Sequence, residues 1–184
     1  MSIQNDRWIR DQAIRNQMIE DFGEEQAAAG AISRDLPLHG FDLRITGKLK
    51  MLTQAKSPLI NPTGFDEAPF VAVQAGSAIG PRNSFAWAHS VHYFRIPRDV
   101  LTICVGKSTH ARYGIATEPN AIEPEQERFE TKKISQTTAL PDRVYANEKL
   151  CQVLFFRSDE PSQVRCDGRK GKHLKYQRDC ASEA

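Results

Sequence analysis

The chain has 184 residues, of which 40% are hydrophobic and 26% charged, and its formal net charge is +2. This balance excludes a disordered polyelectrolyte, a collagen-like fibre and a coiled coil. No apolar run approaches the roughly 20 residues that span a membrane. Because residues 1–15 are polar and charged, we predict a cytoplasmic protein without a secretory signal or membrane contact. The length suits a single domain, residues 1–184.

The four cysteines are far apart in the sequence and form no CxxC pair: Cys104, Cys151, Cys166 and Cys180. A structural zinc site needs closely spaced ligand pairs, so no zinc site is expected. A chain of this size without a signal peptide is not expected to depend on disulfides either. We therefore predict ordinary thiols, with Cys104 and Cys151 buried, and no metal site built by the protein itself.

The N-terminal segment, residues 1–30, is expected to be helical. Residues 5–19 carry a rough apolar stripe at helical spacing, and Asn5 or Asp6 can cap the helix. A second short helix is expected over residues 24–29, ending near Gly30.

After this segment the apolar residues alternate with polar ones, a period of two that is typical of strands. The strand candidates are residues 41–46, 48–52, 70–73, 84–92, 101–105, 128–136 and 150–156. Pro-, Gly- and Asn-containing turns separate them. Many short strands with such punctuation predict a mainly β fold, an antiparallel sandwich or distorted barrel with short N-terminal helices.

Charge is unevenly distributed along the chain. Residues 118–130 hold five acids and one base, whereas residues 165–178 hold six bases and one acid. A local basic tail on a nearly neutral protein argues against duplex nucleic acid as a partner. The tail, residues 160–184, suits a lid that folds over a small polyanion such as a nucleoside triphosphate, and a solvated terminus explains its composition equally well.

The segment with the most chemistry directly follows the strand candidate 101–105. Residues 106–115 read GKSTHARYGI and combine two cations, two hydroxyls and two glycines. Backbone N–H groups, hydroxyls and cations placed after a strand can hold phosphate. The P-loop pattern is absent, and a polar surface turn is the alternative interpretation.

Residues 93–104, YFRIPRDVLTIC, together with the GKST and AR that follow, resemble bacterial dCTP deaminase. That family converts dCTP to dUTP without zinc and is related to the trimeric dUTPases. The resemblance extends along most of the chain, through residues 40–44, 61–62, 65–67, 81–86, 123–125, 137–141, 145–148 and 152–156. It implies a dUTPase-like jelly roll, a homotrimer with sites between subunits, a pyrimidine deoxynucleoside triphosphate ligand, and Mg²⁺ bound through the phosphates.

The resemblance also implies roles for individual residues. Ser108 and Arg112 correspond to residues that serve catalysis. The nucleotide contacts map onto Lys107, Ser108, Thr109, Arg112, Asn120, Glu123, Lys172, Lys175, Tyr176 and Gln177. An apparent insertion leaves two alignments of the tail open.

The sequence departs from the family at the catalytic carboxylate. Matches on both sides place Lys133 where the family strand, VTLEF, has the glutamate that acts as general base. A protonated ammonium cannot accept the proton of water. Glu130 is expected on the opposite face of the strand, and Glu127 roughly 20 Å away along it, so neither is a substitute.

Two further departures surround this position. Glu130 and Lys132 replace apolar residues of the family strand, and residues 116–121 replace a segment near IVNVTP that offers backbone groups to the pyrimidine. Three charge changes on one strand indicate local rebuilding.

The sequence therefore supports two hypotheses. The first is a dCTP deaminase of pyrimidine deoxynucleotide metabolism, whose catalytic residues would be Ser108, Arg112 and Lys133, the last at the position of the family's glutamate. The second is a catalytically impaired relative that binds nucleotide or regulates, or an enzyme shifted to a modified pyrimidine nucleotide.

Overall fold

The computed structural model describes residues 1–22, 37–53 and 70–161. The expected helix over residues 24–29, the matches at 61–62 and 65–67, two of the four cysteines and the tail contacts Lys172, Lys175, Tyr176 and Gln177 lie outside these residues. The elements are β1 (Ser2–Ile3), α1 (Asp6–Asn16), β2 (Phe41–Leu52), β3 (Phe70–Gln74), β4 (Ser77–Gly80), β5 (Phe85–Arg95), β6 (Val100–Gly106), α2 (Ser108–Ala111), β7 (Ile115–Thr117), β8 (Asn120–Ile122), β9 (Glu127–Gln136), β10 (Asp142–Tyr145) and β11 (Lys149–Arg157).

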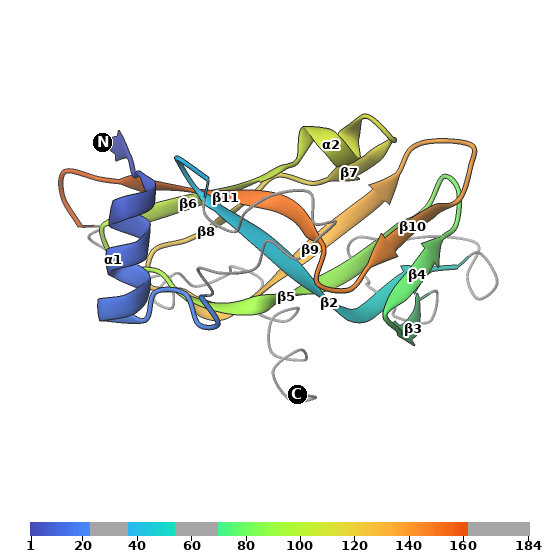
Figure 1. Ribbon diagram of the computed structural model, residues 1–184, viewed down its shortest axis with the longest axis horizontal. Coiled ribbons are helices and arrows are strands. Elements are labelled where there is room, and N and C mark those ends of the chain that lie inside the picture. Colours follow the sequence, from blue (N-terminus) through green and yellow to red (C-terminus); the bar gives the residue numbers. More distant parts are fainter. Residues whose placement is uncertain (23–36, 54–69, 162–184) are drawn as a thin grey trace, which may run out of the picture.

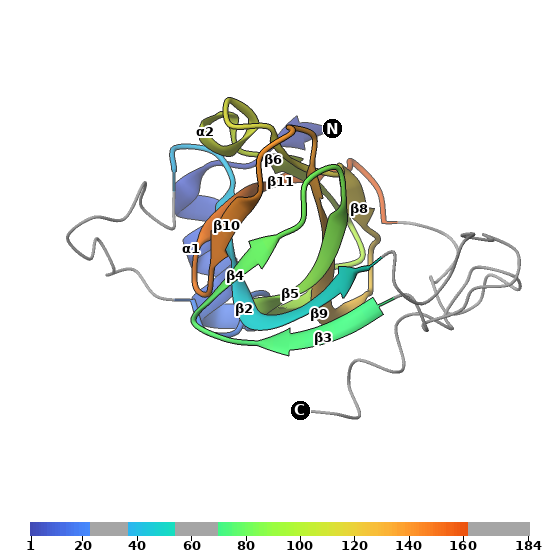
Figure 2. The same ribbon diagram turned by 90° about the vertical axis from the view of Figure 1, so that its right-hand side faces the viewer.

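Nearly all of the described strands belong to one curled antiparallel sheet (Figures 1 and 2). Its order is β7-β9-β5-β2-β11-β6-β8, with β1 added to β11 and β3 added to β2, and β10 pairs with β4 in a small second sheet. Viewed from one end, the sheet closes most of the way round on itself (Figure 2). The prediction of a mainly β, distorted antiparallel barrel is confirmed.

The long central strand β2 produces much of the curl by changing partners along its length. Its first residues pair with β11, and its last residues pair with β5 and β3. The register with β5 shifts between Ile45 and Leu49, on either side of Gly47. A Cβ at Gly47 would lie 2.5 Å from the Ala75 carbonyl oxygen, so only glycine fits this close approach. Such irregularities bend a strand and increase its twist, which lets the sheet close.

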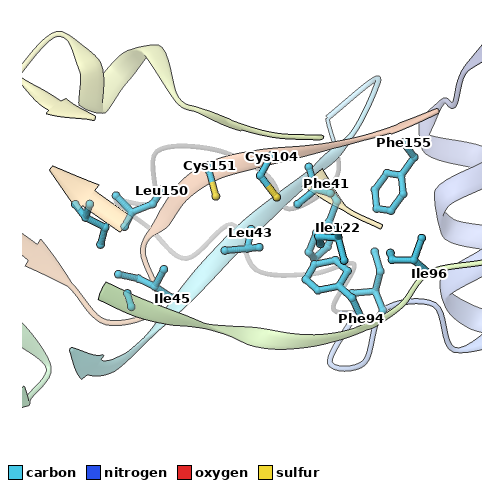
Figure 3. Packing of buried hydrophobic residues seen from close by; sticks show 14 of the residues in the cluster. Phe41, Leu43, Ile45, Phe94, Ile96, Cys104, Ile122, Leu150, Cys151 and Phe155 are labelled. Carbon is cyan, nitrogen blue, oxygen red and sulfur yellow. The ribbon is translucent and has the colours of Figure 1, made fainter. Parts of the chain in front are cut away.

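The core fills the inside of the curl, where the side chains shown in Figure 3 lie between β11 and β5. Alternate residues of each strand supply it, because successive side chains point to opposite faces. Its largest members include Phe41, Leu43, Phe94, Ile122 and Phe155. Cys104 and Cys151 are free, buried thiols, as predicted. Burial raises the pKa of both thiols, that of Cys151 to about 11, so both stay protonated at neutral pH.

The N-terminal helix is shorter than the predicted 5–19. Asn5 caps it, accepting a hydrogen bond of 3.0 Å from the Trp8 amide. Gln17 adopts a left-handed conformation, with φ 52°, and ends the helix at Asn16. Ile19, expected at the helix end, instead forms a β bridge with Phe94 and is buried there. The apolar residues after the helix therefore belong to the sheet contact rather than to the helical stripe.

Candidate functional site

The GKSTHAR segment forms a helical turn on the upper edge of the sheet (Figure 1). Lys107 precedes α2, which has four residues, and Gly114 then returns the chain into β7. Gly114 has φ 77°, and a Cβ there would lie 2.2 Å from the Thr138 side chain, so the return requires glycine. The close fit of Gly114 against Thr138 fixes the end of this segment.

Lys107 anchors the start of α2 to the sheet. Its ammonium lies 2.6 Å from an oxygen of Asp42 on β2, and the two side chains are only 15% and 2% exposed. Charge-assisted hydrogen bonds of this length are strong, and a buried carboxylate needs such a partner. The ammonium that the resemblance assigns to the nucleotide therefore pairs with Asp42 in this structure.

The middle of α2 is anchored as well. The Nε2 atom of buried His110 lies 3.0 Å from Glu148, just before β11. Burial alone would raise the pKa of Glu148, but the hydrogen bonds from His110 and from the Tyr145 amide lower it overall. With Lys107 and His110 both turned inward, Ser108 and Arg112 are left exposed on the outer surface of α2.

Lys133 lies on the outer face of β9, near one carboxylate and several aromatic rings. Its ammonium is 3.5 Å from Glu118, and the two side chains are 41% and 53% exposed. The same ammonium lies 4.9 Å above the ring of Phe85. Trp87 is the cross-strand neighbour of Lys133 on β5 and stacks on Phe70 at 4.3 Å. Trp87 therefore packs against other aromatic rings on this face.

Glu118 is held beside Lys133 by the pairing of β7 with β9. Thr117 pairs with Ile134, and the Glu118 amide donates to the Lys133 carbonyl over 3.3 Å. The Ser135 hydroxyl lies 3.4 Å from the same carboxylate oxygen. Sequence reasoning did not place Glu118 next to position 133. Only the β7–β9 register brings the two together, and no local pattern encodes it.

The two acids considered as substitutes lie elsewhere. Glu130 is 2% exposed and lies on the core side of β9, opposite to Lys133, as predicted. Glu127 is exposed at the other end of the strand, 3.8 Å from Arg95. Glu118 is therefore the carboxylate that meets Lys133 within the described part of the chain.

A charged network fills the core side of the same strand. Lys132, only 1% exposed, donates to the Glu118 carbonyl over 2.9 Å and to the side chain of Asn120. The Asn120 amide donates to Glu130, which also pairs with Arg128 at 3.1 Å. Burial raises the pKa of Glu130, against the opposing influence of Arg128, Asn120 and Lys132. Asn120, expected to contact nucleotide, thus faces this network.

The remaining expected contacts lie around these two groups. Thr109 is half-buried on α2, and Glu123 follows β8, where its amide donates to Gln126 over 3.0 Å. Within one chain, β7 follows α2 in the sequence and pairs with β9 in the sheet. In the described ranges, no set of three His, Cys, Asp or Glu side chains is placed to hold a metal ion. None of the described helices is long and apolar enough to cross a membrane.

An antiparallel sheet curled around one core, with an anchored turn of hydroxyl and cationic residues beside it, places the protein among the mainly β proteins. Residues 3–158 match the family model of dCTP deaminase-like proteins. The chain is 54% identical over 177 residues to a dCTP deaminase of Acidobacterium capsulatum and 45% identical over 183 residues to one of Chlamydia caviae, covering 96% of both chains in each case. The chain belongs to the dCTP deaminase-like family.

The fold has a counterpart among solved structures. The crystal structure of 2'-deoxycytidine 5'-triphosphate deaminase from Agrobacterium tumefaciens aligns with a TM-score of 0.64 at 18% sequence identity. The alignment covers 83% of this chain and 47% of the other. The fold expected from the resemblance is therefore confirmed.

Proposed function

We propose that this protein is a dCTP deaminase, which hydrolyses dCTP to dUTP and ammonia. Family membership and near full-length relatives with that name support the reaction class. The observation that carries the proposal is the tethered α2 turn, in which Lys107 and His110 are fixed inward so that Ser108 and Arg112 face solvent.

Arg112 and Ser108 would contact the nucleotide, since a planar guanidinium suits bidentate contact with phosphate oxygens. Mg²⁺ would arrive with the triphosphate and be held by its oxygens, because the described residues offer no protein cage. Lys107 would act indirectly by fixing the turn. Lys172, Lys175, Tyr176 and Gln177 remain predicted contacts of the lid-like tail.

Arg112→Ala should weaken dCTP binding by more than about 1.5 kcal/mol, as expected for the loss of a charge-assisted hydrogen bond. Titration calorimetry measures this, and Arg143→Ala, which removes an exposed arginine from β10, is the matched control. Equal dCTP affinity in the Arg112 variant and the wild type would remove Arg112 from the site.

The reaction needs a group that takes a proton from water. The oxygen of water bonds to C4 of cytosine, its two protons end on ring N3 and on the amino group, and the amino group leaves as ammonia. Glu118 is suited to this proton transfer because it is a half-exposed carboxylate, with an oxygen 3.5 Å from the ammonium of Lys133. The base would then be Glu118, which the pairing of β7 with β9 holds beside position 133, rather than residue 133 itself.

Ammonia release from dCTP tests this role. Glu118→Gln should lower the rate ~10²–10⁴-fold, the usual cost of losing a general base, while Glu127→Gln, at the far end of β9, should not. An undiminished rate in the Glu118 variant would refute its role as the base. No release by the wild type would refute the deaminase proposal itself.

A second candidate function is supported by the ammonium of Lys133 at the family's base position. In it, the protein binds a pyrimidine nucleotide without deaminating dCTP, as a regulatory relative or as an enzyme for a modified pyrimidine. Tight dCTP binding by the wild type without ammonia release would favour it. Ammonia release gained by Lys133→Glu would then show that one residue blocks the reaction.

We further propose a homotrimer with sites between subunits, because the residues of α2 and those around Lys133 lie on separate elements, and because β7 and β8 are the edges of the sheet among the described strands. Sedimentation equilibrium at working concentration should give three times the chain mass, and a monomer would contradict the proposal. The cytoplasmic location stays a prediction.

A further inference from the structure

Strand β9 sends consecutive lysines to opposite faces of the sheet, and both reach the same turn. This turn, residues 118–119, connects β7 to β8 and is called the β7–β8 turn below. Lys133 meets the Glu118 side chain from the outer face, at 3.5 Å. Lys132 meets the Glu118 carbonyl from the core face, at 2.9 Å. The turn is therefore held from both sides of the sheet.

The two contacts differ in burial, and therefore in how firmly each holds the turn. The outer pair is half-exposed, and such pairs are weak because water screens them and both side chains lose freedom. Lys132 is buried, so its ammonium is tolerated only with acceptors in fixed positions. Its acceptors are the Glu118 carbonyl and the Asn120 side chain, one on each side of Pro119.

The rest of the network fixes Lys132 in turn. Asn120 accepts from Lys132 through its oxygen and donates to Glu130 through its amide, so its orientation is determined. Glu130 is held by Arg128, and its own backbone amide donates to Ser90 over 2.8 Å. A chain of contacts thus runs from β5 through β9 to the β7–β8 turn.

We propose that Lys132 is a positioning residue, whose buried ammonium fixes the β7–β8 turn and so places the Glu118 carboxylate on the outer face. This role rests on the proposed function, because Glu118 is the base proposed there. The network is not needed to fill the core, since apolar side chains of similar volume often replace a buried ion pair without loss of stability. What apolar side chains cannot provide is a donor for the Glu118 carbonyl.

Amide hydrogen exchange measured by NMR tests the proposal without relying on activity. The Glu118 amide donates to the Lys133 carbonyl, and its exchange reports opening of the turn. In Lys132→Met, this exchange should accelerate at least about tenfold relative to the amides of β6 and β11. Because the single variant leaves Glu130 short of a cation, the paired variant Glu130→Val with Lys132→Leu is measured as well.

The paired variant separates positioning from stability. Its denaturation midpoint should lie above that of Lys132→Met, because no buried carboxylate is left short of a cation, while Glu118 exchange still accelerates at least about tenfold. Lys133→Met, the matched control from the outer face, should change the exchange less than about threefold. Wild-type exchange at Glu118 in the paired variant would overturn the proposal, as would an acceleration that merely follows global stability.

Ammonia release separates this proposal from the proposed function. If the wild type deaminates dCTP, the paired variant should lose kcat at least about tenfold while KM stays within about threefold, because the turn and not the phosphate contacts has moved. If the wild type releases no ammonia, the deaminase proposal fails and accelerated exchange still supports the anchoring of the turn by Lys132. Unchanged kcat in the paired variant of an active enzyme would overturn the link to Glu118.

Discussion

The two faces of β9 carry the same kinds of charged side chains with opposite consequences. On the core face, Glu130 and Lys132 are buried, and each is surrounded by partners. On the outer face, Lys133 and Glu118 meet over 3.5 Å in partial contact with solvent. A charge on the core face must be fully partnered to exist at all, whereas one on the outer face can move to meet a ligand. The comparison teaches that the core face fixes shape and the outer face is available for chemistry.

The largest effect should come from breaking the core-face network. Lys132→Met should lower the free energy of unfolding by about 3–5 kcal/mol, because it takes a nearby cation from buried Glu130 and leaves two oxygens, of Glu118 and Asn120, without their donor. Urea denaturation at pH 7 measures this. A loss below about 1 kcal/mol would show that the two faces are energetically alike and break the comparison.

A smaller loss is expected from Asn120→Ala, which removes the bridge between Lys132 and Glu130 but leaves both charges. We expect about 1–3 kcal/mol, the cost of leaving buried polar groups without a partner. Urea denaturation again measures it, with Asn147→Ala, an exposed asparagine, as control. A loss in the control equal to that at Asn120 would mean that the bridge has no special role.

Lys133→Met, on the outer face, should cost less than about 1 kcal/mol, since half-exposed ion pairs contribute little. Its stability should also respond to salt no more than that of the wild type. A loss of unfolding free energy comparable to that of Lys132→Met would show that the outer-face pair also stabilises the fold, and would contradict the difference between the two faces.

The smallest effect concerns pH and the outer face of β5. The pKa of His89 is lowered from 6.5, first by burial and then by Lys50 and Lys48. The unfolded chain therefore binds a proton at a higher pH than the folded one, so the stabilisation from neutral His89 is complete above pH 6.5 and is lost as the pH falls from there through the lower pKa of the folded state. His89→Asn should show a flatter decline between pH 6.5 and 5 in urea denaturation. An unchanged decline would exclude His89 as its cause.

Runs of apolar or alternating residues predicted six of the strands, and five of these, β2, β5, β6, β9 and β11, bury alternate residues against the core. Short strands such as β7, β8 and β10 were not predicted, since three or four residues carry too little pattern. The end of α1 was misplaced because Met18 and Ile19 are apolar at helical spacing but are buried by the sheet instead. Local pattern reports that a residue is buried, and not which element buries it.

The candidate site was predictable to the same extent. The resemblance identified the α2 segment and position 133, but the partner of Lys107 comes from the distant strand β2, and that of Lys133 from the β7–β8 turn that strand pairing brings alongside. Lys132 is the clearest case, because nothing local distinguishes a lysine destined for the core from its neighbour destined for solvent. Whether each lysine is buried or exposed depends on which acceptors the folded chain brings within its reach.

The place of β11 in the sheet has a consequence for how the protein is made. β11, at the end of the described chain, pairs with both β2 and β6 and joins the two halves of the sheet. On the ribosome, the earlier strands emerge with their apolar faces exposed and can only form separate pieces until residues 149–157 leave the exit tunnel. Non-local pairing of this kind slows folding and leaves the waiting strands open to aggregation. Synthesis that pauses or stops before β11 should therefore yield aggregated chains rather than a smaller folded protein.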